Sequence, residues 1–219
     1  MNLRIFDDHE ALAQAAARTI RLSKAKTIVV TGGSTPTRLY EILGHSLPAG
    51  VTWILLDERY VPMSDPQSNA AMVERTLFAR GVPDRWLRFK TELEDPAETA
   101  RVFEAEWRQL GVEHADLVLL GCGDDGHTAS LFPGTPVLEV TDRIASEVFV
   151  PRLDQWRVTL TLPVIRAATA RIVLATGASK ANVIRELREG ADYPIARATK
   201  DISTWWFVDR AAVGSAGHA

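Results

Sequence analysis

Cysteine, excess charge and long apolar runs are scarce in this chain, and each scarcity excludes a class of protein. Cys122 is the only cysteine among 219 residues, so no disulfide framework can form within the chain, which indicates a reducing compartment. No apolar run is long enough to span a bilayer, and residues 1–8 carry charges where a secretory signal would be apolar. We therefore expect a cytoplasmic protein without a membrane segment.

The charge balance argues against a nucleic-acid partner. Lysine and arginine total 25, aspartate and glutamate total 28, and the net charge is −3, whereas nucleic-acid-binding proteins usually carry a basic stripe. Hydrophobic residues make up 46% and charged residues 24%, which is typical of a globular protein. No linker divides the chain, so we expect one domain over residues 1–219, with a weakly ordered tail at about 210–219. The oligomeric state stays open.

Short apolar segments alternate with helical patterns along the chain. The predicted strands cover residues 27–31, 51–56, 116–120, 144–150, 158–162, 171–175 and 204–208, and the predicted helices cover 7–22, 37–43, 68–78, 96–110, 163–168 and 179–189. This alternation predicts an α/β fold, a doubly wound and mostly parallel sheet flanked by helices. Ligands of such sheets bind beyond the carboxyl ends of the strands. Chemistry-bearing residues follow three predicted strands, at 32–35, 57–60 and 121–127, so we expect them to meet in one crevice.

The first of these segments, GGSTP at residues 32–36, has the features of a phosphate-binding turn. Gly33 lets the backbone turn its N–H groups outward, the helix that follows adds partial positive charge, and Ser34 and Thr35 add hydroxyl donors. The alternative is a tight strand-to-helix turn with a capping hydroxyl. A Walker A loop is excluded, because no Gly-Lys-Ser/Thr follows.

Residues 121–126 (GCGDDG) match the G-x-G-x-x-G pattern of dinucleotide-binding loops, but that interpretation fails. Asp124 and Asp125 would repel a pyrophosphate, and Pro133 and Pro136 leave too little room for the helix that should receive it. The glycines are better explained by a sharp bend that presents Asp125 and the histidine two positions later. In an extended stretch, side chains two apart point the same way.

His127 is the leading catalytic candidate, because an imidazole titrates near neutrality and suits general acid–base work. The Asp125 carboxylate would favour the protonated ring and fix its orientation. One alternative is a histidine that only stabilises its own loop. Another is a metal site that uses Cys122, Asp124, Asp125 and His127, but no second histidine or cysteine stands at ligand spacing, so we predict no metal.

Charged side chains elsewhere add candidate ligands for an anion. Asp57 follows an apolar strand and points into the expected crevice, and Arg59 could hold a phosphate or carboxylate through its planar fork. We expect Glu58 to form an exposed ion pair with Arg59. Lys180 stands in the first turn of a predicted helix, where it opposes the helix dipole unless an anion is bound, and Arg157 is a second such cation. Both could instead be ordinary surface charges.

Five segments together resemble a known family. They are TGGSTP at 31–36, DERYVP at 57–62 with Asp65 and Ser68-Asn69 after it, GCGDDGHTASLFP at 121–133, RVTLTLP at 157–163 and GASKA at 177–181. On these segments the chain resembles, over nearly its whole length, the 6-phosphogluconolactonases, which form a wider group with the glucosamine-6-phosphate deaminases and isomerases. One position departs from the deaminases: Phe132 stands where they carry the acid that assists sugar-ring opening.

The resemblance implies hydrolysis of 6-phospho-D-glucono-1,5-lactone to 6-phospho-D-gluconate, in the oxidative pentose phosphate pathway, without a metal or organic cofactor. His127 matches the catalytic histidine and would activate water, with Asp125, and Asp57 as a second candidate, orienting its ring. Lys180 matches the phosphate-binding lysine. The full set of expected phosphate ligands is Gly33, Ser34, Thr35, Arg59, Arg157 and Lys180.

Two other functions remain open at this point. A hexose-6-phosphate isomerase or deaminase would use Asp57, which matches the acid that abstracts a proton in the deaminases, but it would lack the acid replaced by Phe132. A non-catalytic sugar-phosphate sensor should lack His127 or carry a DNA-binding segment. The partner that the resemblance implies is a small phosphorylated sugar lactone.

Overall fold

The structure, a computed structural model, describes residues 1–214 and contains a seven-stranded sheet in which every neighbouring pair of strands is parallel. In spatial order the strands are β1 (Asn2–Phe6), β10 (Thr204–Asp209), β9 (Ala170–Ala175), β6 (Leu117–Gly121), β2 (Thr27–Val30), β3 (Thr52–Leu55) and β5 (Trp86–Leu87). The central strands are almost wholly buried runs of valine, leucine and isoleucine, as expected where helices cover both faces. The predicted parallel sheet is confirmed.

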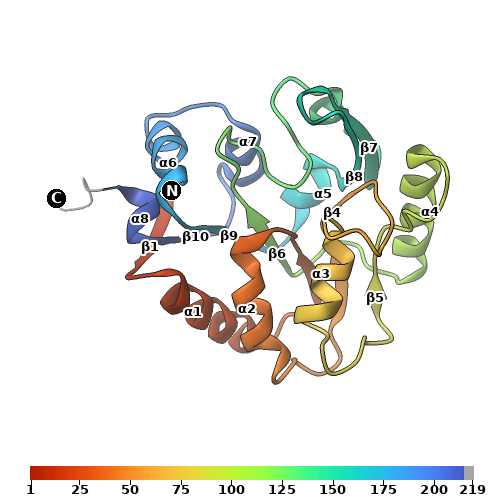
Figure 1. The fold of residues 1–219 in the computed structure, drawn as a ribbon, viewed down its shortest axis with the longest axis horizontal. Helices are drawn as coiled ribbons and strands as arrows, with labels where there is room; N and C mark the ends of the chain where they lie inside the picture. Colours follow the sequence, from red (N-terminus) through yellow and green to blue (C-terminus); the bar gives the residue numbers. More distant parts are fainter. Residues whose placement is uncertain (215–219) are drawn as a thin grey trace.

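Helices cover this sheet on both sides. The α-helices of residues 1–214 are α1 (His9–Leu22), α2 (Ser34–Gly44), α3 (Asn69–Thr76), α4 (Pro96–Gln109), α5 (Leu162–Ala167), α6 (Ala181–Arg188), α7 (Pro194–Thr199) and α8 (Arg210–Val213). In Figure 1, α1, α2 and α3 lie side by side below the strands, whereas α5, α6 and α7 lie above them. This arrangement confirms the predicted doubly wound α/β fold. No helix of residues 1–214 has the length and apolar character needed to cross a bilayer.

A second, antiparallel sheet contains three strands in the order β4 (Asp57–Arg59), β8 (Gln155–Leu160) and β7 (Ala145–Val150). We expected residues 144–150 and 158–162 to extend the parallel sheet, and this placement is wrong. The connection between them is a single 3-10 turn, η2 (Pro151–Leu153), followed by Asp154 in the left-handed region. A connection this short can join only antiparallel strands, because parallel strands need a crossover of a dozen or more residues.

Leu56 joins the two sheets. Its backbone N–H donates to Val30 O of β2 at 2.8 Å, and its carbonyl accepts from Leu160 N of β8 at 2.9 Å. The chain therefore passes from β3 directly into β4, whereas we predicted that the strand stops at Asp57 and no second strand follows there. The pairing of β4 with β8 sets Arg59 opposite Arg157, so two of the predicted cations become neighbours.

The two ends of the chain differ from the sequence prediction. Strand β1 was missed, because its residues are exposed or half-exposed and Arg4 interrupts the apolar run that marks a buried strand. Residues 210–213 were expected in a weakly ordered tail but form α8, whose first turn is capped by the Asp209 side chain through Ala212 N at 2.8 Å. The same carboxylate accepts from Gly177 N at 3.0 Å, which ties this end of the chain to the loop after β9. The rest of the predicted tail, residues 215–219, lies outside the described residues.

The order of the strands locates the site. Successive strands add in one direction from β2 through β3 to β5, and then the chain returns to place β6 on the other side of β2. The loops after β2 and β6 diverge at this reversal, and a crevice at the carboxyl ends of the strands is the usual ligand site of such a sheet.

Candidate active site

A cavity of about 200 Å³ lies at this reversal and brings together the predicted site residues. The residues that line it include Gly33, Ser34, Thr35, Asp57, Arg59, His127, Arg157 and Lys180. Of the nine predicted site residues only Asp125 lies outside the lining, and its carboxylate contacts Nδ1 of His127. The expected convergence of the three strand ends is therefore present in the structure.

A larger, open depression of about 780 Å³ lies near the amino ends of β1 and β10, away from these residues. Its wall combines Trp205 and Trp206 with the charged side chains of Asp192, Lys200 and Asp201, and the described part of the wall contains no histidine. Size alone does not identify an active site, so we place the chemistry in the smaller cavity, where titratable and cationic groups converge.

The loop between β2 and α2 forms one wall of the cavity. Gly33 has φ of +97°, a conformation that few other residues adopt, and α2 begins at Ser34, three residues earlier than predicted. The Gly33, Ser34 and Thr35 backbone therefore sits at the positive end of an eleven-residue helix. His9 supports this loop from α1 through a hydrogen bond between its Nε2 and Thr35 O at 2.8 Å.

His127 is held by a compact turn. Its Nδ1 lies 2.5 Å from Asp125 Oδ1, and its carbonyl accepts from Gly123 N at 2.8 Å. The predicted contact thus exists, but it arises from a tight turn and not from an extended stretch. A Cβ added at Gly123 would come within 2.0 Å of the ring, which explains that glycine without a dinucleotide. No hydrogen bond within residues 1–214 uses His127 Nε2, so this nitrogen is available to water or substrate.

Two groups hold the imidazole in its orientation. Partial burial alone would raise the pKa of Asp125, but the hydrogen bonds and charge of His127, together with the charge of Arg152, outweigh burial and lower that pKa to about 2. Asp125 is therefore a carboxylate at neutral pH. On the other side of the imidazole, Phe132 stacks with a ring-centroid distance of 4.2 Å and an interplanar angle of 24°. The ring is therefore held at Nδ1 by a carboxylate and on one face by an aromatic ring.

No hydrogen bond within residues 1–214 joins Asp57 to the imidazole. The Asp57 carboxylate is buried and accepts a hydrogen bond from the fully buried Ser130 Oγ at 2.7 Å, while its backbone carbonyl accepts from the Asn69 amide at 2.9 Å. The expectation that Asp57 shares the orientation of His127 is therefore wrong, because its partner is Ser130. Asp57 still lines the cavity as an acid.

Arg59 and Arg157 place two cations on the cavity wall, and neither forms an ion pair with an acidic side chain of residues 1–214. Arg59 donates from Nη1 to Gln67 O at 2.6 Å, but the buried Nε of each arginine has no hydrogen-bond partner among the described residues. Burial is the main reason that the pKa of Arg157 lies below the usual arginine value. Buried N–H groups are normally satisfied, so this pair is suited to an anionic ligand.

Lys180 ends the 3-10 turn η3 (Ala178–Lys180), directly before α6, and not within a regular helix as predicted. Its ammonium group forms an ion pair with the exposed carboxylate of Asp124. Lys180 lines the cavity, so an anionic ligand there would compete with Asp124 for the same cation.

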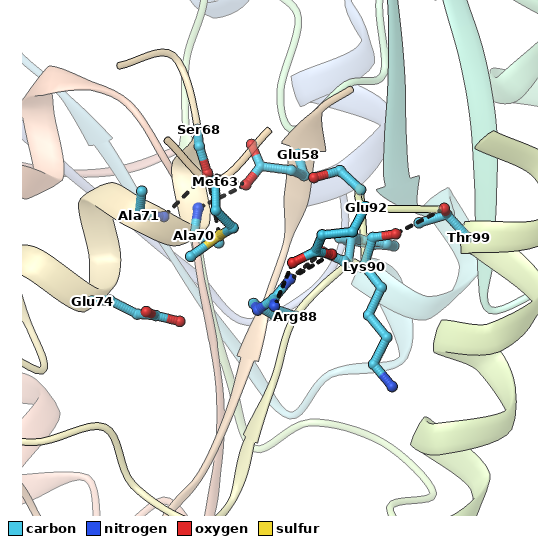
Figure 2. Close-up of polar contacts among 12 residues, drawn as sticks. Glu58, Met63, Ser68, Ala70, Ala71, Glu74, Arg88, Lys90, Glu92 and Thr99 are labelled. Atoms are coloured by element: carbon cyan, nitrogen blue, oxygen red, sulfur yellow. Dashed lines mark hydrogen bonds and ion pairs between the residues drawn. The ribbon is translucent and has the colours of Figure 1, made fainter. Parts of the chain in front are cut away.

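Glu58 is not the exposed ion-pair partner that we expected. Only 1% of it is accessible, and its carboxylate accepts from Asn69 N and Ala70 N at 2.7 Å each and from Ser68 Oγ at 3.0 Å. Figure 2 shows this carboxylate directed at the start of α3. Burial raises the pKa of Glu58, and the backbone N–H groups counteract that effect. The residue thus fixes α3 to β4 and positions Asn69 beside Asp57.

Neither Cys122 nor a metal cluster adds chemistry to the described site. Burial is the main cause that raises the pKa of Cys122 to about 12, so it is a thiol at neutral pH. Within residues 1–214 no group of three or more His, Cys, Asp and Glu side chains is arranged to hold a metal ion. Two contributors were missed in the sequence: the stacking of Phe132 on His127 and the contact of Arg152 with Asp125. Asn69 was part of the quoted motif, but its contact with Asp57 was not predicted. Only the proximity of Phe132 to His127 along the chain offered a signal for the stacking.

Comparisons with known proteins identify the family of this chain. The sequence model of a family described as glucosamine-6-phosphate isomerases/6-phosphogluconolactonase matches residues 7–206. The chain is 36% identical over 217 residues to 6-phosphogluconolactonase of Synechocystis sp., covering 89% of this chain and 88% of that protein. It is 33% identical over 225 residues to the Homo sapiens 6-phosphogluconolactonase, covering 93% and 86%.

Solved structures show the same similarity. The crystal structure of 6-phosphogluconolactonase from Leishmania guyanensis superposes with a TM-score of 0.87 at 28% identity, covering 100% of this chain and 99% of that one. The Thermotoga maritima 6-phosphogluconolactonase superposes with a TM-score of 0.85 at 26% identity, covering 95% and 99%. With its fold and its sequence in agreement, this chain belongs to the glucosamine-6-phosphate isomerase/6-phosphogluconolactonase family.

Proposed function

We propose that this protein hydrolyses 6-phospho-D-glucono-1,5-lactone to 6-phospho-D-gluconate. The observation that carries the proposal is one cavity that combines a carboxylate-supported imidazole, His127, with two arginines whose buried Nε–H groups have no hydrogen-bond partner among the described residues. The first group suits attack of water on an ester carbonyl, and the second suits a phosphorylated substrate. The relatives named above as 6-phosphogluconolactonases support the same substrate.

The hydrolysis needs one proton carrier. His127 Nε2 takes a proton from water as the water oxygen attacks the lactone carbonyl carbon, and Asp125 stabilises the imidazolium that forms. Arg59 or backbone N–H groups of the strand-end loops stabilise the oxyanion. When the intermediate collapses, the bond from the carbonyl carbon to the ring oxygen breaks. His127 then returns its proton to that oxygen, which becomes a hydroxyl group.

The phosphate occupies the cationic side of the cavity. We assign it to the backbone of Gly33, Ser34 and Thr35 at the start of α2, and to the side chains of Arg59, Arg157 and Lys180. Asp124 leaves Lys180 when the phosphate binds, because both anions use the same ammonium group.

The proposal is tested by generating the lactone in situ from glucose 6-phosphate and following its disappearance against the spontaneous rate. We expect the rate to rise in proportion to the protein concentration. A rate equal to the spontaneous one would refute the proposed function and would favour the sensor.

Glucosamine 6-phosphate is expected to yield no ammonia above background. Phe132 packs on the catalytic ring, so an apolar side chain occupies the place of the ring-opening acid. The measurement is a coupled ammonia assay, with the lactone assay on the same preparation as the positive control. Steady ammonia release would favour the isomerase or deaminase alternative, in which Asp57 is the base.

Removal of divalent ions is expected to leave the lactonase rate unchanged, because the proposed steps use only side chains and water. The measurement is turnover before and after exhaustive dialysis against a chelator. A loss of rate that zinc or another divalent ion restores would contradict the mechanism.

We also propose that residues 1–219 act as one domain in the cytoplasm, without a nucleic-acid partner. A single cluster of buried apolar side chains that includes residues of both sheets supports the first point. The near-balanced charge and the single cysteine support the others.

A further inference from the structure

Arg152 contacts the catalytic pair from a part of the chain that the reaction scheme does not use. It lies in the turn η2 between β7 and β8, and its Nη2 is 2.5 Å from Asp125 Oδ2. The other oxygen of the same carboxylate, Oδ1, is 2.5 Å from His127 Nδ1. Asp125 therefore bridges a guanidinium group and the imidazole, with one oxygen committed to each.

Arg152 also touches the second support of the imidazole. Its guanidinium carbon lies 5.0 Å from the centroid of the Phe132 ring, which stacks on His127. Arg157 approaches the same ring at 5.3 Å, so Phe132 contacts the imidazole and two cations. Both groups that hold His127 in place are thus in contact with Arg152.

The location of Arg152 separates it from the substrate ligands. It is absent from the lining of the cavity, whereas Arg157 and Lys180 belong to that lining. Its side chain is 54% exposed, so the ion pair with Asp125 adds little to folding stability. An interaction of this kind can still matter for the reaction, because small displacements of a catalytic group cost much of its rate.

We propose that Arg152 is a positioning residue that holds Asp125, and through it the imidazole of His127, in the orientation needed for proton transfer. With Oδ2 fixed by Arg152, the carboxylate cannot rotate away from Nδ1, and Nε2 stays directed at the cavity. The β7–β8 turn thereby becomes a functional element, because it carries the arginine to the catalytic loop. The kinetic part of this inference rests on the proposed lactonase function.

The kinetic test compares three variants on the phosphorylated lactone. We expect Arg152→Ala to lower kcat by about tenfold and to change KM less than about twofold, because the substrate does not touch this side chain. Arg152→Lys, which keeps the charge but loses the fork, should recover part of the loss. The matched control is Arg210→Ala, since Arg210 is 63% exposed and pairs with Asp7 at 2.8 Å, outside the cavity lining. It should match the wild type.

A second readout does not depend on the substrate. In ¹⁵N-histidine-labelled protein, His127→Ala assigns the Nδ1–H resonance, which we expect to be sharp in the wild type and broadened or shifted in Arg152→Ala. Broadening without any lactonase rate in the wild type would refute the proposed function but support the positioning role. An unchanged resonance together with unchanged kcat would overturn the inference. A rise in KM at constant kcat would overturn it too, because Arg152 would then be a substrate ligand.

Discussion

His127→Ala is expected to lower kcat for the phosphorylated lactone by about 10²–10⁴-fold, the usual contribution of a general acid–base group. The fold should persist, because the backbone bond from Gly123 N to the carbonyl of residue 127 does not need the side chain. The measurement is kcat at saturating lactone, together with thermal unfolding of both proteins.

The matched control for this variant is His114→Ala, which removes an exposed imidazole that is not part of the cavity lining. It should retain wild-type turnover. If His127→Ala instead keeps near-wild-type turnover, the ring only stabilises its loop and the proposed mechanism is wrong.

Lys180→Ala is expected to lower kcat/KM for the phosphorylated lactone by roughly 10–150-fold, chiefly through KM. A hydrogen bond to a charged group contributes about 1.5–3 kcal/mol, which corresponds to that range. Unphosphorylated gluconolactone, a poor substrate in any case, should be hardly affected. Folding should be preserved, because the ion pair that is lost joins Lys180 to the exposed Asp124 and such pairs add little stability.

The measurement is kcat/KM for both lactones in the wild type, in Lys180→Ala and in Lys200→Ala. Lys200 is an exposed lysine outside the cavity lining, so its loss should leave both values unchanged. Equal losses on the two substrates in Lys180→Ala would show that Lys180 does not recognise the phosphate. The assignment of the cationic side of the cavity would then have to be abandoned.

The sequence predicted well those parts of the fold that depend on local pattern. The central strands β2, β6 and β9 are runs of apolar residues buried on both faces, so their composition alone identifies them. Strand β1 pairs along only one edge and is half exposed, so it carries no comparable pattern. The transfer of β4 into a second sheet depends on pairing with β8, about a hundred residues later, which no local pattern records.

The same distinction between local sequence pattern and long-range contact applies to the site. Asp125 and His127 are two residues apart, so their contact could be predicted, even though the geometry of the turn was not. Glu58 was misread because adjacent opposite charges usually pair in solvent, whereas here the start of α3, eleven residues later, binds the carboxylate through its backbone N–H groups. Arg152 reaches Asp125 because the turn between β7 and β8 lies next to the loop that follows β6. Contacts between residues that are far apart in the sequence leave no local pattern in a single sequence.

The junction at Leu56 limits how this protein can respond to its substrate. A hinge between the two sheets would have to break the hydrogen bonds of Leu56 to Val30 and Leu160, within a fully buried segment. Asp57 and Arg59 lie on one side of this junction, and His127 and Lys180 follow strands of the other sheet. A movement of one sheet against the other would therefore cost both of these buried hydrogen bonds. The free-energy cost of bringing these groups together is met during folding, and binding needs only side-chain changes such as the release of Lys180 from Asp124.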